Sequence, residues 1–226
     1  MKKKVLVIGG SGDIGSSITK IFSNSCDVFS TSRKELDLSS KENINAFIEN
    51  NHNCYDHIVF CAANNDPNEF TSIDYSEIEN SVQVNLFSII EILHAFLKRN
   101  LINKKGSIII ISSLYSHIGR SKRFPYSLSK HALSGLVKNL SIECSQMKIR
   151  VNSVSPGFID TKLTKKNLSD SEIENLKDKI PAGKLGSPED VANIVFFLAS
   201  ENAQYINGQD IIVDGGFICG GFMGIN

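Results

Sequence analysis

The 226-residue sequence has no tryptophan, only three methionines and no long apolar run. The apolar stretch after the lysine-rich amino terminus, residues 5–8, stops at two glycines and is too short for the core of a secretion signal. No other run approaches the roughly 18 apolar residues that a membrane-spanning helix needs. We therefore expect a cytoplasmic protein with no membrane partner.

Cysteine and histidine are also sparse and scattered. The five cysteines are odd in number and lack any C-x-x-C spacing, and the five histidines are dispersed along the chain. The sequence therefore predicts neither a disulfide framework nor a metal site. The cysteines, which we expect to be buried or incidental thiols, are Cys26, Cys54, Cys61, Cys144 and Cys219.

Neither sign of charge is in excess, because 24 lysines and arginines match 24 aspartates and glutamates. This balance gives no global electrostatic reason to bind nucleic acid. With 41% hydrophobic residues the chain can bury one sizeable core, and no segment has the composition of a linker. We expect one globular domain that covers residues 1–226.

Short, almost continuously apolar runs alternate with segments of helical spacing. Continuous apolar character is typical of parallel strands covered on both faces. The alternation predicts right-handed crossovers and an α/β fold, a Rossmann-like doubly wound parallel sheet with helices on both faces. The expected strands are residues 4–8, 27–31, 56–61, 107–112, 150–155 and 210–213, and the expected helices are 15–23, 41–50, 75–99, 126–146 and 188–200.

A glycine-rich loop, Gly9-Gly-Ser-Gly-Asp-Ile-Gly15, joins the first strand directly to a helix. In that context Gly9 permits a tight turn, Gly12 permits close approach of a pyrophosphate, and Gly15 lets the helix pack on the strand. The N–H groups and dipole at the helix start favour phosphate. The spacing differs from the commonest dinucleotide fingerprint, so an ordinary strand–helix turn is the alternative.

The end of the second strand bears on cofactor choice. An acidic residue there would bind the adenosine ribose of NAD, whereas an arginine accommodates the 2′-phosphate of NADP. The strand ends with Ser32 and Arg33, so we favour NADP(H), with Arg33 at the phosphate and Ser32 where the acid would stand. Glu35 and Asp37 lie close enough in sequence to leave NAD(H) open.

Tyr126 and Lys130 are one helical turn apart, and Ser113 follows an apolar run that predicts a strand. A nearby ammonium stabilises a phenolate, which lowers the pKa of tyrosine from about 10 toward neutrality. Ligands of open α/β sheets bind at the carboxyl ends of strands, where Ser113 could hydrogen-bond a substrate oxygen. The alternative is an ordinary helix-surface pair and a serine that merely ends a strand.

These motifs, in this order and across almost the whole chain, resemble the short-chain dehydrogenase/reductase family, in the branch that includes 3-oxoacyl-carrier-protein reductases. The resemblance implies a sheet of about seven strands and catalysis by Ser113, Tyr126, Lys130 and Asn85, the last through a water-linked proton relay. It also extends to the tail, residues 180–192 and 207–216. The cofactor-binding residues expected from the loop and the resemblance are Gly9, Ser11, Gly12, Asp13, Ile14, Gly15, Ser32, Arg33, Asp37, Leu38, Cys61, Ala62, Ala63, Tyr126, Lys130, Pro156, Gly157, Ile159 and Thr161.

The sequence departs from the family pattern in three places. Residues 60–63, Phe-Cys-Ala-Ala, stand where the family usually has Asn-Asn-Ala-Gly, so Phe60 and Cys61 could simply pack the strand. Asp13 replaces the family's middle glycine, and its carboxylate should point away from the pyrophosphate. Only residues 34–36 separate Arg33 from Asp37, so a short turn replaces the helix that the family inserts there.

The resemblance implies hydride transfer between a nicotinamide and a carbonyl or secondary alcohol, with Tyr126 exchanging the proton. We expect reduction of a carbonyl, with a 3-oxoacyl thioester as the first candidate substrate and a keto-sugar or nucleotide sugar as the alternative. The resemblance also implies a homo-oligomer, a dimer or tetramer, and the apolar tail 217–225 could be buried in it or pack beside the site. A non-catalytic nucleotide-binding regulator is the hypothesis of another class.

Two basic segments flank the expected substrate end of the site. They could attract a phosphate-bearing substrate, or they could be solvated surface, since acidic residues follow closely. The basic residues are Arg120, Lys122, Arg123, Lys162, Lys165 and Lys166, and the apolar walls expected there are Tyr115, Ile118, Phe124, Phe158 and Leu163.

Overall fold

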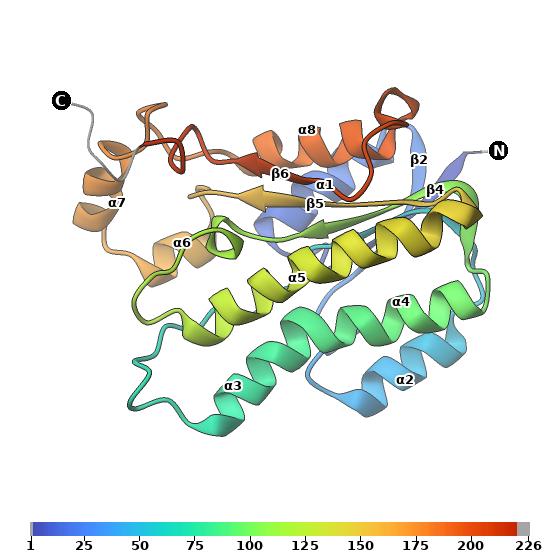
Figure 1. Ribbon diagram of the computed structural model, residues 1–226, viewed down its shortest axis with the longest axis horizontal. Coiled ribbons are helices and arrows are strands. Elements are labelled where there is room, and N and C mark those ends of the chain that lie inside the picture. The colour runs from blue at the N-terminus through green and yellow to red at the C-terminus, as the bar shows by residue number, and fades with distance from the viewer. Residues whose placement is uncertain (1, 221–226) are drawn as a thin grey trace.

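Six parallel strands form one twisted sheet in the computed structural model, which describes residues 2–220 (Figure 1). The spatial order is β2-β1-β3-β4-β5-β6, which reverses direction next to β1 and confirms the doubly wound α/β fold. The strands are β1 (Lys3–Ile8), β2 (Cys26–Thr31), β3 (Tyr55–Phe60), β4 (Ile102–Ile111), β5 (Arg150–Pro156) and β6 (Asp210–Val213).

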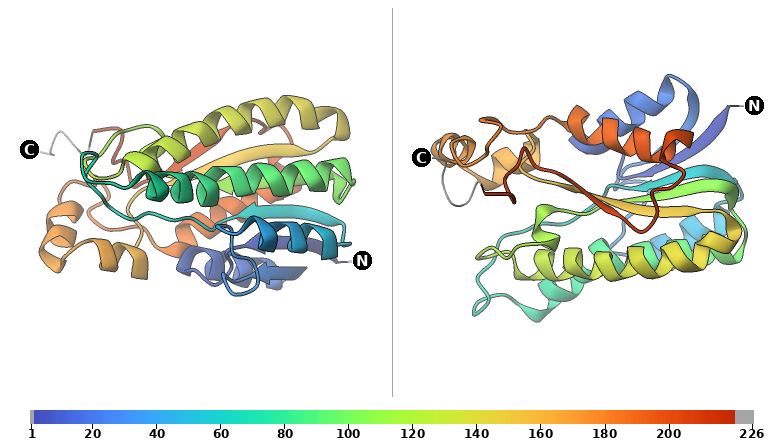
Figure 2. Two further views of the ribbon diagram at one scale, coloured as in Figure 1. Left: turned by 90° about the horizontal axis from the view of Figure 1, so that it is seen from below. Right: turned by 45° about the horizontal axis from the view of Figure 1, so that its top comes forward.

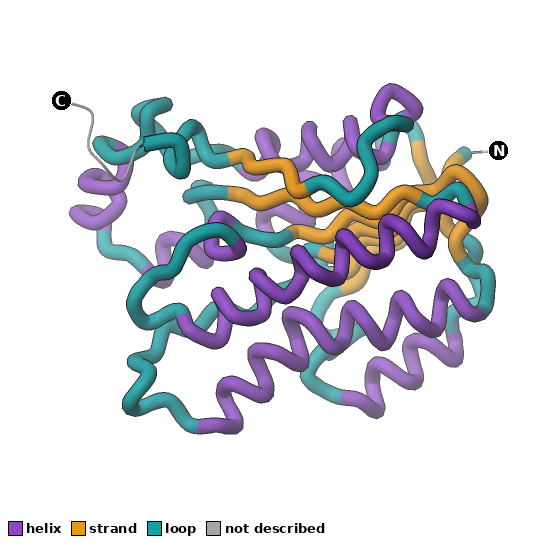
Figure 3. Tube along the Cα trace, in the orientation of Figure 1, coloured by secondary structure: helices purple, strands orange, loops and turns teal. Residues whose placement is uncertain are grey.

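Helices cover both faces of the sheet, as the continuous apolar strands require. On one face α2 (Lys41–Asn50), α4 (Ser88–Lys98) and α5 (Phe124–Glu143) bury side chains such as Ile44, Phe96 and Leu133 against the sheet. On the other face α1 (Asp13–Ser23) and α8 (Pro188–Ala199) do the same with Ile18 and Val195. Figures 2 and 3 show the sheet between these two helical layers.

Two short helices, α6 (Lys162–Asn167) and α7 (Asp170–Lys177), gather at the end of the sheet where β5 ends (Figures 1 and 2). The sequence analysis did not predict them, because their residues are mostly polar and lack an apolar stripe. Capping side chains begin both: Thr161 accepts from the Thr164 N–H, and Ser169 forms a capping box with Glu172. Local polar contacts rather than core burial thus define this end of the molecule.

The sheet has six strands in the described part of the chain, rather than the seven or so that the resemblance implied. After β2 the chain makes the expected short turn, in which the Glu35 and Leu36 N–H groups donate to the Ser32 carbonyl. Leu36 and Leu38 are then buried in the core, and the chain enters α2 without forming another strand. Strand β2 is therefore the edge of the sheet, which leaves Phe29 38% exposed.

The helix expected over residues 75–99 is interrupted by a π-helical turn. Helix α3 (Tyr75–Val82) passes into the π turn Gln83–Phe87 and then into α4. Such turns are rare and occur frequently at functional sites, and this one contains Asn85. By length and composition the whole segment Tyr75–Lys98 could cross a membrane, a test that the core helix of a folded protein also passes.

The other boundaries differ modestly from the sequence prediction. Strand β4 begins at Ile102, five residues earlier than expected, and its pairing with β3 is irregular between Tyr55 and His57. Helix α5 begins at Phe124, with proline in its first turn, and ends at Glu143 before a 3-10 turn, Cys144–Met147. Two further 3-10 turns are Leu114–Ser116 and Glu201–Ala203.

Candidate functional site

A cleft of about 770 Å³ lies at the carboxyl ends of the strands. It is lined by the segments that follow β1, β2, β3, β4 and β5, which is where open α/β sheets bind ligands. Every residue that the sequence analysis assigned to cofactor binding lines this cleft, as does Ser113, whereas Asn85 lies behind its wall. Among residues 2–220 no group of three or more histidine, cysteine or acidic side chains could hold a metal ion.

The glycine loop fits a phosphate because the backbone itself forms one wall of the cleft. Gly9 has a φ of 88°, and a Cβ there would lie 2.5 Å from the Ala62 nitrogen. A Cβ on Gly15 would collide with the Gly9 carbonyl oxygen, whereas at Gly12 the nearest atom is 3.7 Å away. Gly9 and Gly15 are thus needed for packing, and Gly12 leaves room beside the first-turn N–H groups of α1.

Asp13 connects the glycine loop to the opposite rim of the cleft. Its Oδ2 accepts a hydrogen bond of 2.6 Å from the backbone N–H of Lys162, at the start of α6. The replacement of the family's middle glycine therefore gives this chain a link between two segments that are 149 residues apart.

Arg33 lies at the rim of the cleft near the end of β2, and its side chain is 84% exposed. Its nearest acidic partner is Asp37, with 3.7 Å between Nε and Oδ2. Both nearby carboxylates already accept other hydrogen bonds: Ser32 donates to Glu35, and Ser39 donates to Asp37. These bonds lower the pKa of each carboxyl. The Arg33 guanidinium is therefore only weakly held by the protein.

The unusual segment after β3 packs as an ordinary strand end. Phe60 is buried in the core, and the N–H groups of Cys61 and Ala62 both donate to the Ile8 carbonyl. Burial raises the pKa of the Cys61 thiol to about 12, so that thiol stays protonated. Residues 60–62 are thus held by core packing and by backbone hydrogen bonds to β1.

Ser113, Tyr126 and Lys130 come together on one wall of the cleft. Ser113 follows β4, and the other two face the cleft from α5. Lys130 is only 1% exposed, its Nζ donates to the Ile111 carbonyl over 2.8 Å, and it lies 5.5 Å from the centre of the Tyr126 ring. The helical spacing of Tyr126 and Lys130, together with the packing of α5 beside the end of β4, places all three residues on one wall of the cleft.

The pKa of Tyr126 moves in the opposite direction to the sequence-based expectation. Burial raises it to about 12, opposed first by the Ser113 hydroxyl and then by the positive charge of Arg123. Burial likewise lowers the pKa of Lys130 to about 8. For Tyr126, loss of hydration outweighs the opposing Ser113 hydrogen bond and Arg123 charge, because the hydroxyl lies in a poorly solvated wall. Tyr126 is thus protonated near neutral pH.

Asn85 is fully buried and holds the loop after β3. Its Oδ1 accepts from the Asn64 N–H over 2.7 Å, and its Nδ2 donates to the Asn64 carbonyl and to the Ser129 hydroxyl of α5. Asn85 belongs to the π turn Gln83–Phe87. Asn64 and Asn65, which line the cleft, were missed by the sequence analysis, although two asparagines just after a strand were a usable signal.

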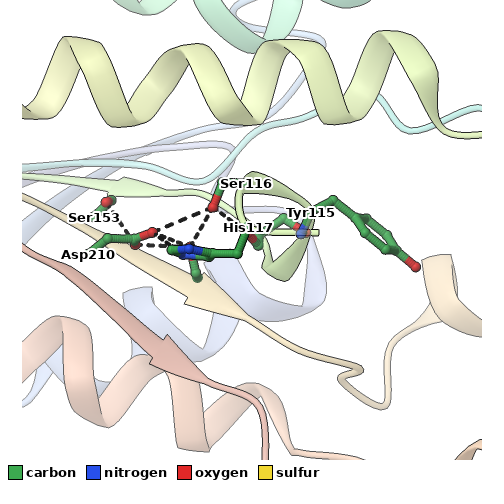
Figure 4. A network of polar contacts seen from close by, with 7 residues as sticks. Tyr115, Ser116, His117, Ser153 and Asp210 are labelled. Carbon is green, nitrogen blue, oxygen red and sulfur yellow. Dashed lines mark hydrogen bonds and ion pairs between the residues drawn. The ribbon is translucent and has the colours of Figure 1, made fainter. Parts of the chain in front are cut away.

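A network around Asp210 anchors the segment that carries Ser113 (Figure 4). The Asp210 carboxylate on β6 accepts hydrogen bonds from Ser153 and Ser155 on β5, and it lies 2.8 Å from His117 Nε2. Ser116, within the 3-10 turn after Ser113, lies 3.2 Å from the Ser155 hydroxyl. Tyr115 points away from this network, with its ring 6.1 Å from that of Tyr126.

Pro156, Gly157, Ile159 and Thr161 form the rim that follows β5. A Cβ on Gly157 would lie 2.7 Å from the Asp214 Cα, so this rim packs closely on the segment after β6. Ile159 is 4% exposed, and Thr161 caps α6.

Of the apolar walls expected at the substrate end, Tyr115, Phe158 and Leu163 line the cleft. Phe124 instead packs on Phe70, and Ile118 is not among the lining residues. Phe217 packs on Phe158, with ring centres 5.1 Å apart, so the start of the apolar tail lies beside the site. The rest of that tail, residues 221–225, lies outside the described residues.

Comparisons with known proteins agree with this geometry. A family model described as enoyl-(acyl carrier protein) reductase matches residues 17–218. The 3-oxoacyl-[acyl-carrier-protein] reductase of Aquifex aeolicus is 34% identical over 215 residues, which cover 94% of this chain and 86% of that protein.

Two solved structures share the fold over almost the whole chain. A short chain dehydrogenase family protein from Francisella tularensis subsp. tularensis SCHU S4 has a TM-score of 0.88 at 23% identity, covering 97% of this chain and 100% of that one. The aldohexose dehydrogenase of Thermoplasma acidophilum has a TM-score of 0.85 at 26% identity, covering 96% and 94%. The chain therefore belongs to the short-chain dehydrogenase/reductase family, and it is an oxidoreductase of the class that uses NAD or NADP.

Proposed function

We propose that this protein reduces a carbonyl to a secondary alcohol with NADPH, and that a 3-oxoacyl thioester is the first substrate class to test. The observation that carries the proposal is the convergence of Ser113, Tyr126 and Lys130 with the glycine loop on one cleft. The resemblance to the Aquifex aeolicus reductase supports the 3-oxoacyl class.

In this proposal each side chain has a distinct task. NADPH, when bound, supplies the hydride that is transferred to the carbonyl carbon. The Tyr126 hydroxyl, which burial keeps protonated, donates its proton to the carbonyl oxygen. Ser113 donates a hydrogen bond to the same oxygen, and Lys130, 5.5 Å from the phenol ring, stabilises the phenolate that remains.

The cofactor site is proposed to run from Arg33 past the glycine loop to the rim after β5. Arg33 would bind the 2′-phosphate of NADP, since its guanidinium is exposed and held only by a 3.7 Å contact to Asp37. Gly12 and the first turn of α1 would hold the pyrophosphate. The residues proposed to line the nicotinamide end are Cys61, Ala62, Ala63, Pro156, Gly157, Ile159 and Thr161.

A second candidate is a sugar or nucleotide-sugar oxidoreductase, which the likeness to the Thermoplasma acidophilum aldohexose dehydrogenase favours. The two candidates share the cofactor and the catalytic residues and differ in the apolar or polar character of the substrate.

One experiment separates these functions. The purified protein is titrated with NADPH and, separately, with NADH, and nicotinamide absorbance is then followed with acetoacetyl thioester plus the reduced cofactor or with an aldohexose plus NADP+ or NAD+. Thioester-dependent oxidation of NADPH supports the first proposal, and turnover of sugars alone supports the second. Failure to bind either cofactor would contradict both.

We further propose a single domain over residues 1–226, a cytoplasmic location and a dimer or tetramer formed through α4 and α5. Exposed apolar side chains on or beside these helices support the assembly, because large exposed apolar groups favour association. They are Phe87, Ile90 and Leu128, which are 49%, 37% and 45% exposed. Light scattering of the purified protein tests the assembly, and a monomer would contradict it.

A further inference from the structure

The basic residues at the substrate end of the cleft fall into three groups. Lys162 lines the cleft, is exposed and forms no ion pair within residues 2–220. Three lysines form exposed ion pairs: Lys122 with Glu69 at 2.9 Å, Lys165 with Asp160 at 2.7 Å, and Lys166 with Asp66 at 3.8 Å. Exposed pairs of this kind are screened and contribute little. The two arginines of the set, Arg120 and Arg123, form no ion pair with a carboxylate of the described chain, and both line the cleft.

Arg123 is a buried cation whose charge the described chain does not balance. Arg123 is only 5% exposed. Its Nη1 donates hydrogen bonds to Asn65, one to the side-chain Oδ1 over 2.9 Å and one to the backbone carbonyl over 3.3 Å. Its Nε is buried and has no hydrogen-bond partner within residues 2–220. Burying an unpaired charge is costly, so the missing partner is expected to be an anion that binds there.

The position of Arg123 relates this unbalanced charge to the reaction. It immediately precedes α5, three residues before Tyr126, and its positive charge opposes the rise in the pKa of the Tyr126 hydroxyl. Arg120 adds a second cation nearby, fixed by a 2.8 Å hydrogen bond to the Tyr115 hydroxyl and lying 5.9 Å from the Phe158 ring. The proposed cofactor phosphates lie beside the glycine loop and Arg33, so they do not explain Arg123.

We propose that Arg123 binds a carboxylate of the substrate, so that the preferred carbonyl compound is a small 2-oxo or 3-oxo acid. This rests on the proposed carbonyl reduction but predicts an oxo acid as a better substrate than the 3-oxoacyl thioester named first, because a neutral ester or thioester at the same carbon would leave the guanidinium unbalanced. Arg123 and Tyr126 line the same cleft, so a substrate with a carboxylate one or two carbons from its carbonyl can present the carboxylate to Arg123 and the carbonyl to Tyr126. Arginine also suits the task because its planar guanidinium can donate two parallel hydrogen bonds to a carboxylate.

The test compares acetoacetate with methyl acetoacetate, which share the ketone and differ in charge. With NADPH, the wild-type protein is expected to have a kcat/KM at least about tenfold higher for the acid, as expected for charge-assisted hydrogen bonds. The Arg123→Gln variant is expected to lose that preference, so that its ratio of kcat/KM for acid over ester falls toward one, mainly through a higher KM for acetoacetate. Arg123→Lys keeps the charge and is expected to retain part of the preference.

Lys122→Gln is the matched control, because Lys122 is adjacent, basic and paired with Glu69 outside the cleft lining. It should leave the preference for acetoacetate unchanged. The proposal is overturned if the wild-type protein turns over ester and acid equally, or if Arg123→Gln weakens both alike, as expected of a residue that only holds Asn65. If no carbonyl compound oxidises NADPH, the proposed function itself fails, which is a distinguishable result.

Discussion

The two halves of the cleft are built in different ways. Around Gly9 and Gly15 the wall is backbone, and added side-chain atoms would collide with neighbouring main chain. Around Tyr126 the wall is made of side chains from β4, α5 and the rim after β5, held by hydrogen bonds and ring contacts. The glycine loop of the first half offers backbone groups to a phosphate, whereas the second half depends on which side chains are present. Cofactor class is therefore a property of the fold, and substrate choice is a property of this chain.

Tyr126→Phe should have the largest effect of these variants, because it should impair catalysis in the half of the cleft around Tyr126 without impairing cofactor binding in the other half. The variant lacks the proposed proton donor and is expected to lose about 10²- to 10⁴-fold in kcat, while its affinity for NADPH is retained. Steady-state turnover and a fluorescence titration with NADPH measure the two quantities. If the biological effect of the protein persisted unchanged in this variant, the protein would be better described as a non-catalytic nucleotide-binding regulator.

Arg33→Gln should affect only the cofactor half. Loss of a charge-assisted contact to the 2′-phosphate is expected to weaken NADPH binding by about tenfold or more, with little change for NADH. Titration of the wild type and the variant with both cofactors measures the ratio. Lys34→Gln is a neighbouring control, since Lys34 does not line the cleft. Equal weakening of both cofactors would contradict the assignment to NADP.

The pH dependence of kcat should follow the protonation of Lys130, the buried lysine beside Tyr126. Burial lowers the pKa of Lys130 to about 8, so its ammonium is present below pH 8 and is lost as the pH rises through that value. Because the charged form stabilises the phenolate, kcat for reduction should fall by about tenfold per pH unit above pH 8. Lys130→Arg stays charged throughout this range and should remove the decline. A wild-type profile that is flat from pH 7 to 9.5 would contradict this role.

Asn85→Ala should have the smallest effect on chemistry, because this side chain acts through Asn64. The variant leaves the part-buried N–H and carbonyl of Asn64 without their Asn85 partner and is expected to lose about 1–3 kcal/mol of the free energy of unfolding. Urea denaturation followed by circular dichroism measures the loss. Ser81→Ala removes only a 3.3 Å contact to Asn85 and should cost less. Equal stability of the two variants would argue against a special role of the Asn64 loop.

The sequence alone determined the layers and the parallel direction of the strands. Continuous apolar runs such as β1 and β3 can be stable only inside a sheet covered on both faces, and the intervening helical patterns require parallel crossovers. The glycine spacing and the spacing of Tyr126 and Lys130 are local, so the amino-acid order is enough to predict both. The short turn after Arg33 is predictable for the same reason.

Only the tertiary structure decided the protonation states and the charge balance of the site. Whether Lys130 lowers the pKa of Tyr126 depends on burial of both groups, and the Ile111 carbonyl that accepts from Lys130 comes from another strand. Likewise the lysines and arginines near the substrate end look alike in sequence, and only packing shows that Lys122 is paired while Arg123 is buried without an anion. Short-range patterns fix local conformation, whereas desolvation and charge balance depend on contacts between residues far apart in the chain.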